Sequence, residues 1–288
     1  MEYGLVETAV NGGLTIKEYK EGIRFGTDAL LLSYFAKDRL GSGVCADFGT
    51  GSGVLPLLLA AAGCKCDFLA VELQEKYACL ARENAVSNGF GEKISVLRGD
   101  LREYRHLFPA GSLQAVISNP PYLPAGSGKQ NLTLEKRTAW HDDTLPAESL
   151  AKAASWGLST GGKFFCVYLP SRMAGLMDAL KRNRLEPKRM RLVVPAHGEA
   201  PSLLLLEARK DGAEGLEILP ELRQVLADHP AAVLAAPPGS GKTTLMNILG
   251  GVLPADSGQI LLDGKPVSFS SPVESLDAGI GFIHQELN

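Results

Sequence analysis

The sequence lacks any apolar run long enough to cross a membrane. Its longest uninterrupted apolar stretch, Val54 to Gly63, is well short of the roughly 18 residues that a membrane-spanning helix needs. The N-terminus carries Glu2 and Glu7 and no basic start followed by an apolar run, so we expect no secretory signal. Cysteine is scarce, and five of them, an odd number in so long a chain, do not build a disulfide framework. We therefore expect a cytoplasmic protein with reduced thiols and no membrane partner.

An excess of charge of one sign is also lacking, because the formal net charge is only −3. The total therefore does not imply a nucleic-acid partner, and the distribution of charge matters more. One stretch of eleven positions sets six basic residues against the single acid Glu186, and they are Lys181, Arg182, Arg184, Lys188, Arg189 and Arg191. Such a run is typical either of a solvated helix end or of a surface that contacts phosphates.

Short apolar runs alternate with helical stretches between residues 44 and 207. The pattern predicts strands at 44–48, 67–71, 94–97, 113–117, 163–169, 191–194 and 202–207. It predicts helices at 54–62, 74–87, 146–158 and 171–183, the last of them capped by Ser171. This alternation favours an α/β fold in which helices cover both faces of a parallel sheet. Ligands of such sheets bind at the carboxyl ends of the strands, where Asp47, Glu72, Asp100 and Asn119 fall.

The stretch from Asp47 to Gly53 follows the first predicted strand and opens a helix. It reads Asp-Phe-Gly-Thr-Gly-Ser-Gly, and its glycines let the backbone turn sharply and approach a ligand. Glu72, nineteen residues after Gly53, ends the next strand, where an acidic side chain can accept both ribose hydroxyls of a nucleoside. A dinucleotide fingerprint would need glycine at position 54, which is Val54. The spacing instead resembles motif I of class I methyltransferases.

The most specific stretch of the chain is Asn119-Pro120-Pro121-Tyr122, at the end of another predicted strand. An aromatic amine or amide nitrogen is a poor nucleophile because its lone pair is delocalised. The side-chain oxygen of Asn119 and the carbonyl of Pro120 can each accept a hydrogen bond from that nitrogen and favour its pyramidal form. Tyr122 can stack on the target ring. This chemistry requires no metal, and the sequence contains no His/Cys cluster to bind one.

These motifs resemble the Asn-Pro-Pro-Tyr methyltransferases and, among them, the tRNA adenine-N6 methyltransferase family that modifies an anticodon-loop adenine of a valine tRNA. Further stretches that carry the resemblance are 25–32, 126–129, 184–189 and 216–220, so it covers about residues 1 to 220. It implies a Rossmann-like class I fold with a seven-stranded, mostly parallel sheet, S-adenosyl-L-methionine as cofactor and tRNA as partner. The stretch 137–142 departs from the element that relatives tend to show there.

The resemblance also implies roles for individual residues. Asp47 and the glycine turn of Gly49, Gly51 and Gly53 would hold the methionine part of the cofactor, Glu72 the ribose and Asp100 the adenine amine. Thr27 and Asp28 stand where relatives contact the cofactor. Asn119, Pro120 and Tyr122 would be the catalytic residues, and Asn119 would also border the cofactor.

Two other functions fit the same motifs. A methyltransferase acting on a glutamine N5 amide of a release factor uses the same tetrapeptide, because an amide poses the same lone-pair problem. Enzymes of that kind carry a helical domain before motif I, and only 46 residues precede Asp47 here, which favours the tRNA substrate. A non-catalytic RNA-binding module is the third interpretation.

A second glycine loop stands at 236–243 and is nearly a P-loop, with Ala236 where the pattern has glycine. Lys242 could reach phosphates and Thr243 could ligate magnesium. From Gly241 onward the chain resembles the start of a sugar-importer ABC ATPase. We therefore expect a polar linker at 211–215, a helix at 221–228, and an incomplete P-loop segment at 221–288. Such a segment could bind ATP, but we do not expect it to hydrolyse ATP.

Overall fold

The computed structural model describes residues 4–10, 13–22, 25–120, 146–194 and 200–223, and the short stretches 248–249, 260–262, 265–271 and 274–275. The chain divides into two compact units. The first comprises Met1–Ala9 and Leu14–Asp228, and the second comprises Val10–Gly13 and His229–Asn288. Among the helices in the described part of the chain, none is both long enough and apolar enough to cross a membrane.

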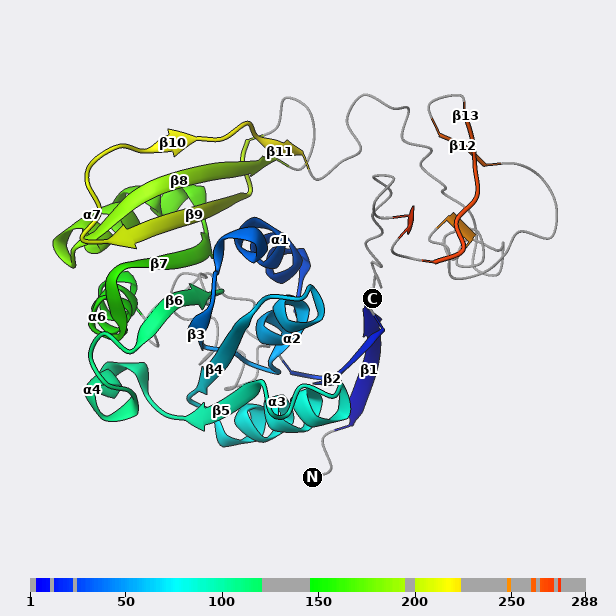
Figure 1. Cartoon of the computed structure of the whole chain (residues 1–288), viewed down its shortest axis with the longest axis horizontal. Helices are drawn as coiled ribbons and strands as arrows, with labels where there is room; N and C mark the ends of the chain where they lie inside the picture. The colour runs from blue at the N-terminus through cyan, green and yellow to red at the C-terminus, as the bar shows by residue number, and fades with distance from the viewer. Residues whose placement is uncertain are drawn as a thin grey trace. The chain divides into compact units, whose positions relative to one another are not determined.

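The first unit is built on one large twisted sheet (Figure 1). Its long strands are β3 (Gly43–Phe48), β4 (Cys66–Glu72), β5 (Ile94–Arg98), β6 (Leu113–Ser118), β7 (Leu158–Tyr168), β8 (Leu185–Val194) and β9 (Leu203–Lys210). Their order is β8-β9-β7-β6-β3-β4-β5, and β9 runs antiparallel to both of its neighbours. The short strands β10 (Glu217–Ile218) and β11 (Leu222–Arg223) pair with β8. The predicted α/β fold with a mostly parallel sheet is thus confirmed.

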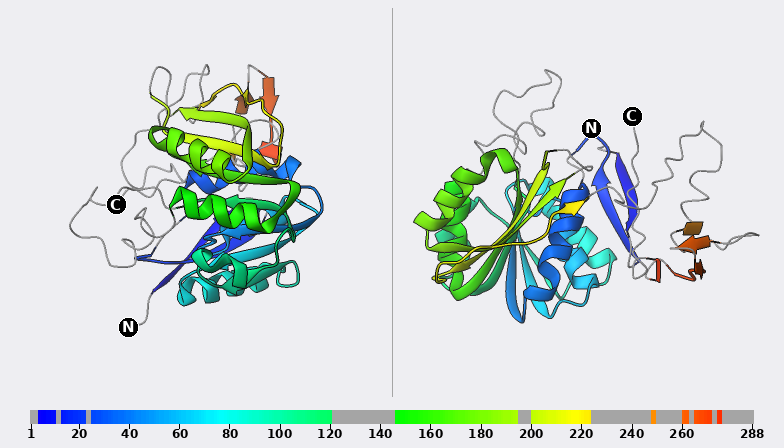
Figure 2. Two further views of the ribbon diagram at one scale, coloured as in Figure 1. Left: turned by 90° about the vertical axis from the view of Figure 1, so that its left-hand side faces the viewer. Right: turned by 90° about the horizontal axis from the view of Figure 1, so that it is seen from above.

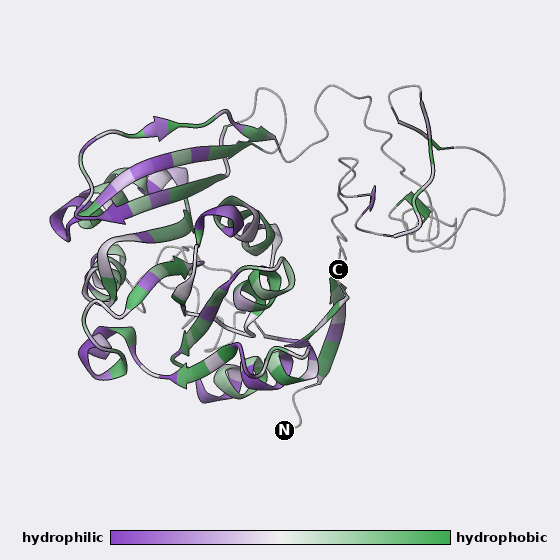
Figure 3. Ribbon diagram, in the orientation of Figure 1, coloured by the Kyte–Doolittle hydropathy of each residue, from purple (hydrophilic) through white to green (hydrophobic). Residues whose placement is uncertain are grey.

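Helices cover both faces of this sheet (Figure 2). The helices on one face are α1 (Thr27–Ala36), α2 (Val54–Ala61) and α3 (Glu75–Ser87). Those on the other face are α4 (Tyr104–Leu107), α6 (Ala147–Gly157) and α7 (Met173–Arg182). The described residues also form short 3₁₀ helices at Lys37–Arg39, Leu101–Glu103 and Pro170–Arg172. Helix α2 is apolar along its whole length, and its Leu57 and Leu59 are completely buried. Hydrophobic residues fill the central strands (Figure 3), as expected for strands buried on both faces.

Several elements differ from the sequence-based expectation. Ser171 lies within a 3₁₀ helix, and Arg172 takes the N-cap position of α7, so the predicted cap was wrong. Strand β8 begins at Leu185 rather than at 191, because its first residues pair with β9. Leu222 is in a strand, not in the expected helix, because it pairs with Val193 of β8. Helix α1 and the N-terminal hairpin of β1 (Leu5–Val10) and β2 (Leu14–Tyr19) were not predicted.

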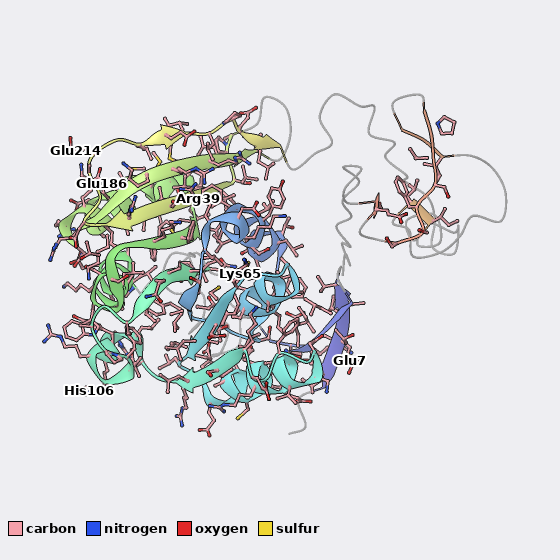
Figure 4. All side chains as sticks on the ribbon, in the orientation of Figure 1. Glu7, Arg39, Lys65, His106, Glu186 and Glu214 are labelled. Carbon is pink, nitrogen blue, oxygen red and sulfur yellow. The ribbon has the colours of Figure 1, made fainter. Side chains whose placement is uncertain are left out.

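Acidic residues of the same unit neutralise much of the basic run. Arg184 pairs with Asp211 at 2.7 Å, and Arg182 pairs with Asp178 at 2.6 Å. Lys181 lies 3.8 Å from Glu186 and 3.9 Å from Glu214, two acids that lie close together at one end of the sheet (Figure 4). The run therefore offers less free positive charge than the sequence alone indicates.

The described part of the second unit contains a short hairpin. Strand β12 (Ile260–Leu262) pairs antiparallel with β13 (Lys265–Val267). Residues 248–249 are helical. The loop itself, 236–243, lies outside the described residues.

Glu207 of β9 is a buried carboxylate that pairs with two arginines, one after α1 and one on β8. Its carboxylate, which is 3 % exposed, pairs with Arg39 at 2.7 Å and with Arg189 at 3.2 Å. Glu207→Gln should lower the free energy of unfolding by about 2 kcal/mol, because two partly buried guanidinium groups would then face each other without a carboxylate. Urea denaturation measures this loss. Glu83→Gln, which breaks the exposed pair with Lys17, is the control and should change stability little. Equal effects of both variants would contradict the prediction.

Candidate active site

Four adjacent strands, β6, β3, β4 and β5, end at the same edge of the sheet because they run parallel. Asp47 lies at the end of β3, Glu72 ends β4, Asp100 follows β5 and Asn119 follows β6. The chain order reverses between β3 and β6, which is the position where sheets of this type bind their ligands. The structure thus brings together the polar residues that the sequence placed at strand ends.

Asp47 is completely buried beneath the glycine loop. Its Oδ2 accepts a hydrogen bond from the Thr50 hydroxyl at 2.6 Å, while its Oδ1 has no hydrogen-bond partner within the described structure. Burial raises the pKa of Asp47 to about 7, Thr50 opposes this shift, and the nearby carboxylate of Glu72 adds to it. A buried acceptor without a donor is costly, so the site is suited to a ligand that brings a donor or a positive charge to Oδ1.

The loop above Asp47 depends on its glycines. Gly49, Gly51 and Gly53 all have positive φ angles, of 76°, 58° and 84°. At Gly49 and Gly51 a Cβ atom would meet nothing within 4 Å, so the backbone there is open to a ligand. At Gly53 a Cβ atom would lie 3.2 Å from the Cβ of Ala81, which shows that the end of the loop packs directly on α3.

Glu72 connects the loop to the end of β4. Its Oε2 accepts from the backbone N–H of Gly51 and its Oε1 from that of Gln74, both at 2.9 Å. Burial raises the pKa of Glu72, and these backbone donors partly offset the shift. Each carboxylate oxygen carries a further lone pair. The geometry leaves Glu72 able to accept two more hydrogen bonds, as a ribose diol would require.

Asp100 borders the same edge, whereas the described contacts of Thr27 and Asp28 are local to the start of α1. The Asp100 carboxylate accepts from the backbone and side chain of Arg102 at 2.9 Å, and the Arg102 side chain lowers its pKa. Thr27 is the first residue of α1, and Asp28 accepts from the N–H of Ala29 at 2.9 Å. Asp100 would therefore have to share its oxygens between Arg102 and a ligand.

The end of β6 is tied directly to the end of β3. The buried Ser118 hydroxyl donates to the Phe48 carbonyl at 2.8 Å, which fixes the position of Asn119 relative to the glycine loop. Asn119 is half-buried and Pro120 is buried. Tyr122 lies outside the described residues, as do the stretches 126–129 and 137–142.

Three residues of the site had no role in the sequence analysis. Thr50 and Ser118 supply the hydroxyls that bond Asp47 and Phe48, and the sequence signal for them is a small polar residue inside each motif. Leu73, directly after Glu72, is 40 % exposed and offers an apolar surface beside the carboxylates. No spacing rule identifies it, because only the structure shows a large apolar side chain left uncovered here.

Comparisons with known proteins agree with this geometry. The family model described as methyltransferase small domain matches residues 20–182, and the model described as ABC transporter matches residues 226–288. The chain is similar to a tRNA1(Val) (adenine(37)-N6)-methyltransferase of Bacteroides fragilis, with 30 % identity over 67 % of this chain and 79 % of the relative. A crystal structure of a predicted O-methyltransferase from Agrobacterium tumefaciens shares the fold, with a TM-score of 0.55 and 24 % identity over 70 % of this chain and 92 % of that one.

The C-terminal part has relatives of another kind. It is similar to a Pseudomonas syringae protein named as a ribose/galactose/methyl galactoside import ATP-binding protein, with 45 % identity over 92 residues. This match covers 31 % of the chain and only 17 % of that relative.

The raised pKa of Asp47 predicts a specific dependence of stability on pH. The folded state keeps a proton up to about pH 7, whereas an aspartate in the unfolded chain, with its ordinary pKa of 3.8, releases that proton at lower pH. Raising the pH through this window therefore destabilises the fold, by about 1.4 kcal/mol for each unit. Asp47→Asn removes this dependence, so it should be more stable than the unsubstituted protein at pH 7.5 and similar to it at pH 4.

Thermal unfolding at a series of pH values measures the effect. Asp100→Asn is the matched control with the opposite sign, because the Asp100 pKa is lowered and its ionised form is the favoured one. Asp100→Asn should therefore be less stable than the unsubstituted protein at pH 7.5. A pH profile of Asp47→Asn that parallels the unsubstituted protein would refute the assignment.

Proposed function

Because this chain belongs to the methyltransferase small domain family, we propose that residues 1–220 transfer a methyl group from S-adenosyl-L-methionine to the exocyclic N6 amine of an adenine in the anticodon-loop region of tRNA. The observation that carries this proposal is the position of Asn119. It follows a strand that the Ser118–Phe48 hydrogen bond ties to the glycine loop, so a cofactor on the loop and an amine at Asn119 would be neighbours.

The residues at the strand ends fit S-adenosyl-L-methionine. The unpartnered Oδ1 of Asp47 would receive the charged methionine part, and the open backbone at Gly49 and Gly51 would lie along it. The free lone pairs of Glu72 would accept the ribose hydroxyls, while Leu73 and Asp100 would border the adenine. Thr27 and Asp28 would contact the cofactor from α1. When bound, this cofactor supplies an electrophilic methyl group on a sulfonium.

Asn119 and Pro120 would prepare the acceptor nitrogen. The Asn119 side-chain oxygen and the Pro120 carbonyl would each accept a hydrogen bond from the amine, which draws its lone pair out of conjugation with the ring. Tyr122 would stack on the base and hold it in line. An unpaired loop base costs less to present in this way than a base in a stem.

The choice of tRNA as partner rests on the similarity to the Bacteroides fragilis relative, and a tRNA substrate places the activity in the cytoplasm. The glutamine amide of a release factor and a non-catalytic RNA-binding module remain the alternatives, and one experiment separates them.

Asn119→Ala should lower kcat for methyl transfer by about 100-fold, because the acceptor amine loses its orienting partner. The binding of S-adenosylmethionine should persist, since Asp47, Glu72 and the loop are unchanged. Incorporation of a labelled methyl group into bulk tRNA and into purified release factor measures the activity. Label in the release factor but not in tRNA would overturn the tRNA proposal. Label in neither, with tRNA still bound, would identify a non-catalytic module.

We further propose that the part of the chain beyond the first unit, residues 229–288, forms a separate P-loop segment. Its similarity to ABC transporter sequences supports ATP binding by this segment, and we propose no ATP hydrolysis. The residues assigned to methyl transfer all lie between 27 and 122. Lys242→Ala should therefore leave methyl transfer to tRNA unchanged, while it weakens any retention of a labelled ATP analogue. A loss of methyl transfer comparable to that of Asn119→Ala would show that the two parts act together.

A further inference from the structure

Asn84 is a completely buried polar residue in the last turn of α3, and all the described hydrogen bonds of its side chain leave the helix. Its Oδ1 accepts from the backbone N–H of Lys17, and its Nδ2 donates to the carbonyl of Lys17, both at 2.9 Å. The same Nδ2 donates to the carbonyl of Ser52, also at 2.9 Å. A single amide thus connects three segments of the chain: α3, the N-terminal strand β2 and the glycine loop.

Asn88, one helical turn further on, provides an internal comparison. It makes the same reciprocal pair with β2, accepting from the N–H of Thr15 and donating to its carbonyl, both at 2.8 Å. The two asparagines therefore hold β2 along α3 much as a neighbouring strand would. The two asparagines differ in their third hydrogen bond. Asn88 donates to the backbone carbonyl of Asn84, within the same helical turn, whereas Asn84 donates to the Ser52 carbonyl in the glycine loop.

Ser52 lies between Gly51 and Gly53, and glycine has less intrinsic preference for a single backbone conformation than other residues. Gly51 is also held by Glu72, and Gly53 rests against Ala81, one turn before Asn84 on α3. Without the Asn84 bond, the Ser52 peptide could rotate and its carbonyl would be left buried without a donor. The cofactor would then have to order the loop when it binds, at a cost in affinity.

Strand β2 also contacts the segment that leads into α1. The buried Glu18 accepts a hydrogen bond from the backbone N–H of Phe25 at 2.7 Å, two residues before Thr27. Two neighbouring residues of β2 thus make these contacts: Lys17 bonds Asn84, which in turn bonds the glycine loop, and Glu18 bonds Phe25, which precedes α1.

We propose that Asn84 is a positioning residue, which couples the N-terminal strand β2 to the glycine loop and presets that loop for the methyl donor. This rests on the proposed function, because the ligand of the loop is taken to be S-adenosylmethionine. Strand β2 then supports the cofactor site through Asn84, although none of its described side chains is assigned to the cofactor.

The test compares Asn84→Asp with Asn88→Asp in the full chain. Both substitutions keep the acceptor for β2 and remove the donor, and only the first removes the bond to Ser52. Calorimetric titration with S-adenosylhomocysteine gives the dissociation constant and the binding stoichiometry separately. Asn84→Asp should weaken binding about tenfold at unchanged stoichiometry, whereas Asn88→Asp should leave the dissociation constant unchanged. In Asn84→Asp the KM for S-adenosylmethionine should rise together with the dissociation constant, while kcat at saturating S-adenosylmethionine should fall much less.

The outcomes are distinct. Failure of the unsubstituted protein to bind S-adenosylhomocysteine would refute the proposed function. Normal binding by the unsubstituted protein, with equal dissociation constants for the two variants, would refute the role of Asn84 alone. A purely structural role of Asn84 would lower the stoichiometry, through unfolded protein, and leave the dissociation constant of the folded fraction unchanged.

A measurement on the unsubstituted protein keeps the proposal testable if Asn84→Asp fails to fold. Coupling is reciprocal, so S-adenosylhomocysteine should slow hydrogen exchange at the backbone amide of Lys17, which is bonded to Asn84. The amide of Thr15, bonded to Asn88, should change much less. Equal protection factors at both amides with and without the ligand would overturn the proposal.

Discussion

The site depends on the burial of two carboxylates, Asp47 and Glu72, at the ends of adjacent strands. A buried carboxylate is tolerated only where donors reach it. Here the glycine loop supplies two of them, the Thr50 hydroxyl to Asp47 and the Gly51 backbone N–H to Glu72, and the Gln74 backbone N–H at the start of α3 supplies another to Glu72. The loop therefore has to fold back over the strand ends. Left-handed backbone at alternate positions provides that path, which is why glycine stands at 49, 51 and 53.

The burial of Asp47 also explains why the empty site lowers the stability of the fold and why the site is suited to a ligand. The second oxygen of Asp47 is buried without a donor, and its pKa of about 7 reflects that cost. A ligand with a donor or positive charge would relieve it. The same residue thus lowers stability and favours binding, a compromise that is common where function requires a buried charge. The Ser118–Phe48 bond then places the acceptor strand against this loop.

Electrostatics on the far side of the sheet follow a different principle. The basic run at 181–191 interleaves with acids that are distant in sequence, such as Asp211 and Glu214. The Arg189 side chain is half-buried and forms an ion pair with the buried carboxylate of Glu207. Four of the six basic residues of this run are paired with acids, so charge counting along the chain overstates the free positive charge at the surface. A proposed tRNA partner does not depend on it.

The sequence by itself determined the alternation of strands and helices between residues 44 and 207, the mostly parallel character of the sheet and the positions of Asp47, Glu72, Asp100 and Asn119 at strand ends. These follow from periodicity and from glycine, which are local properties of the chain. Tertiary structure alone decided which side chains meet. Periodicity does not reveal that the Asn84 side chain bonds both β2 and the glycine loop, or that the Arg102 side chain donates hydrogen bonds to the Asp100 carboxylate. Nor does it reveal that β8 begins as early as Leu185. Those contacts join residues far apart in sequence or depend on side-chain direction, so packing fixes them rather than any local pattern.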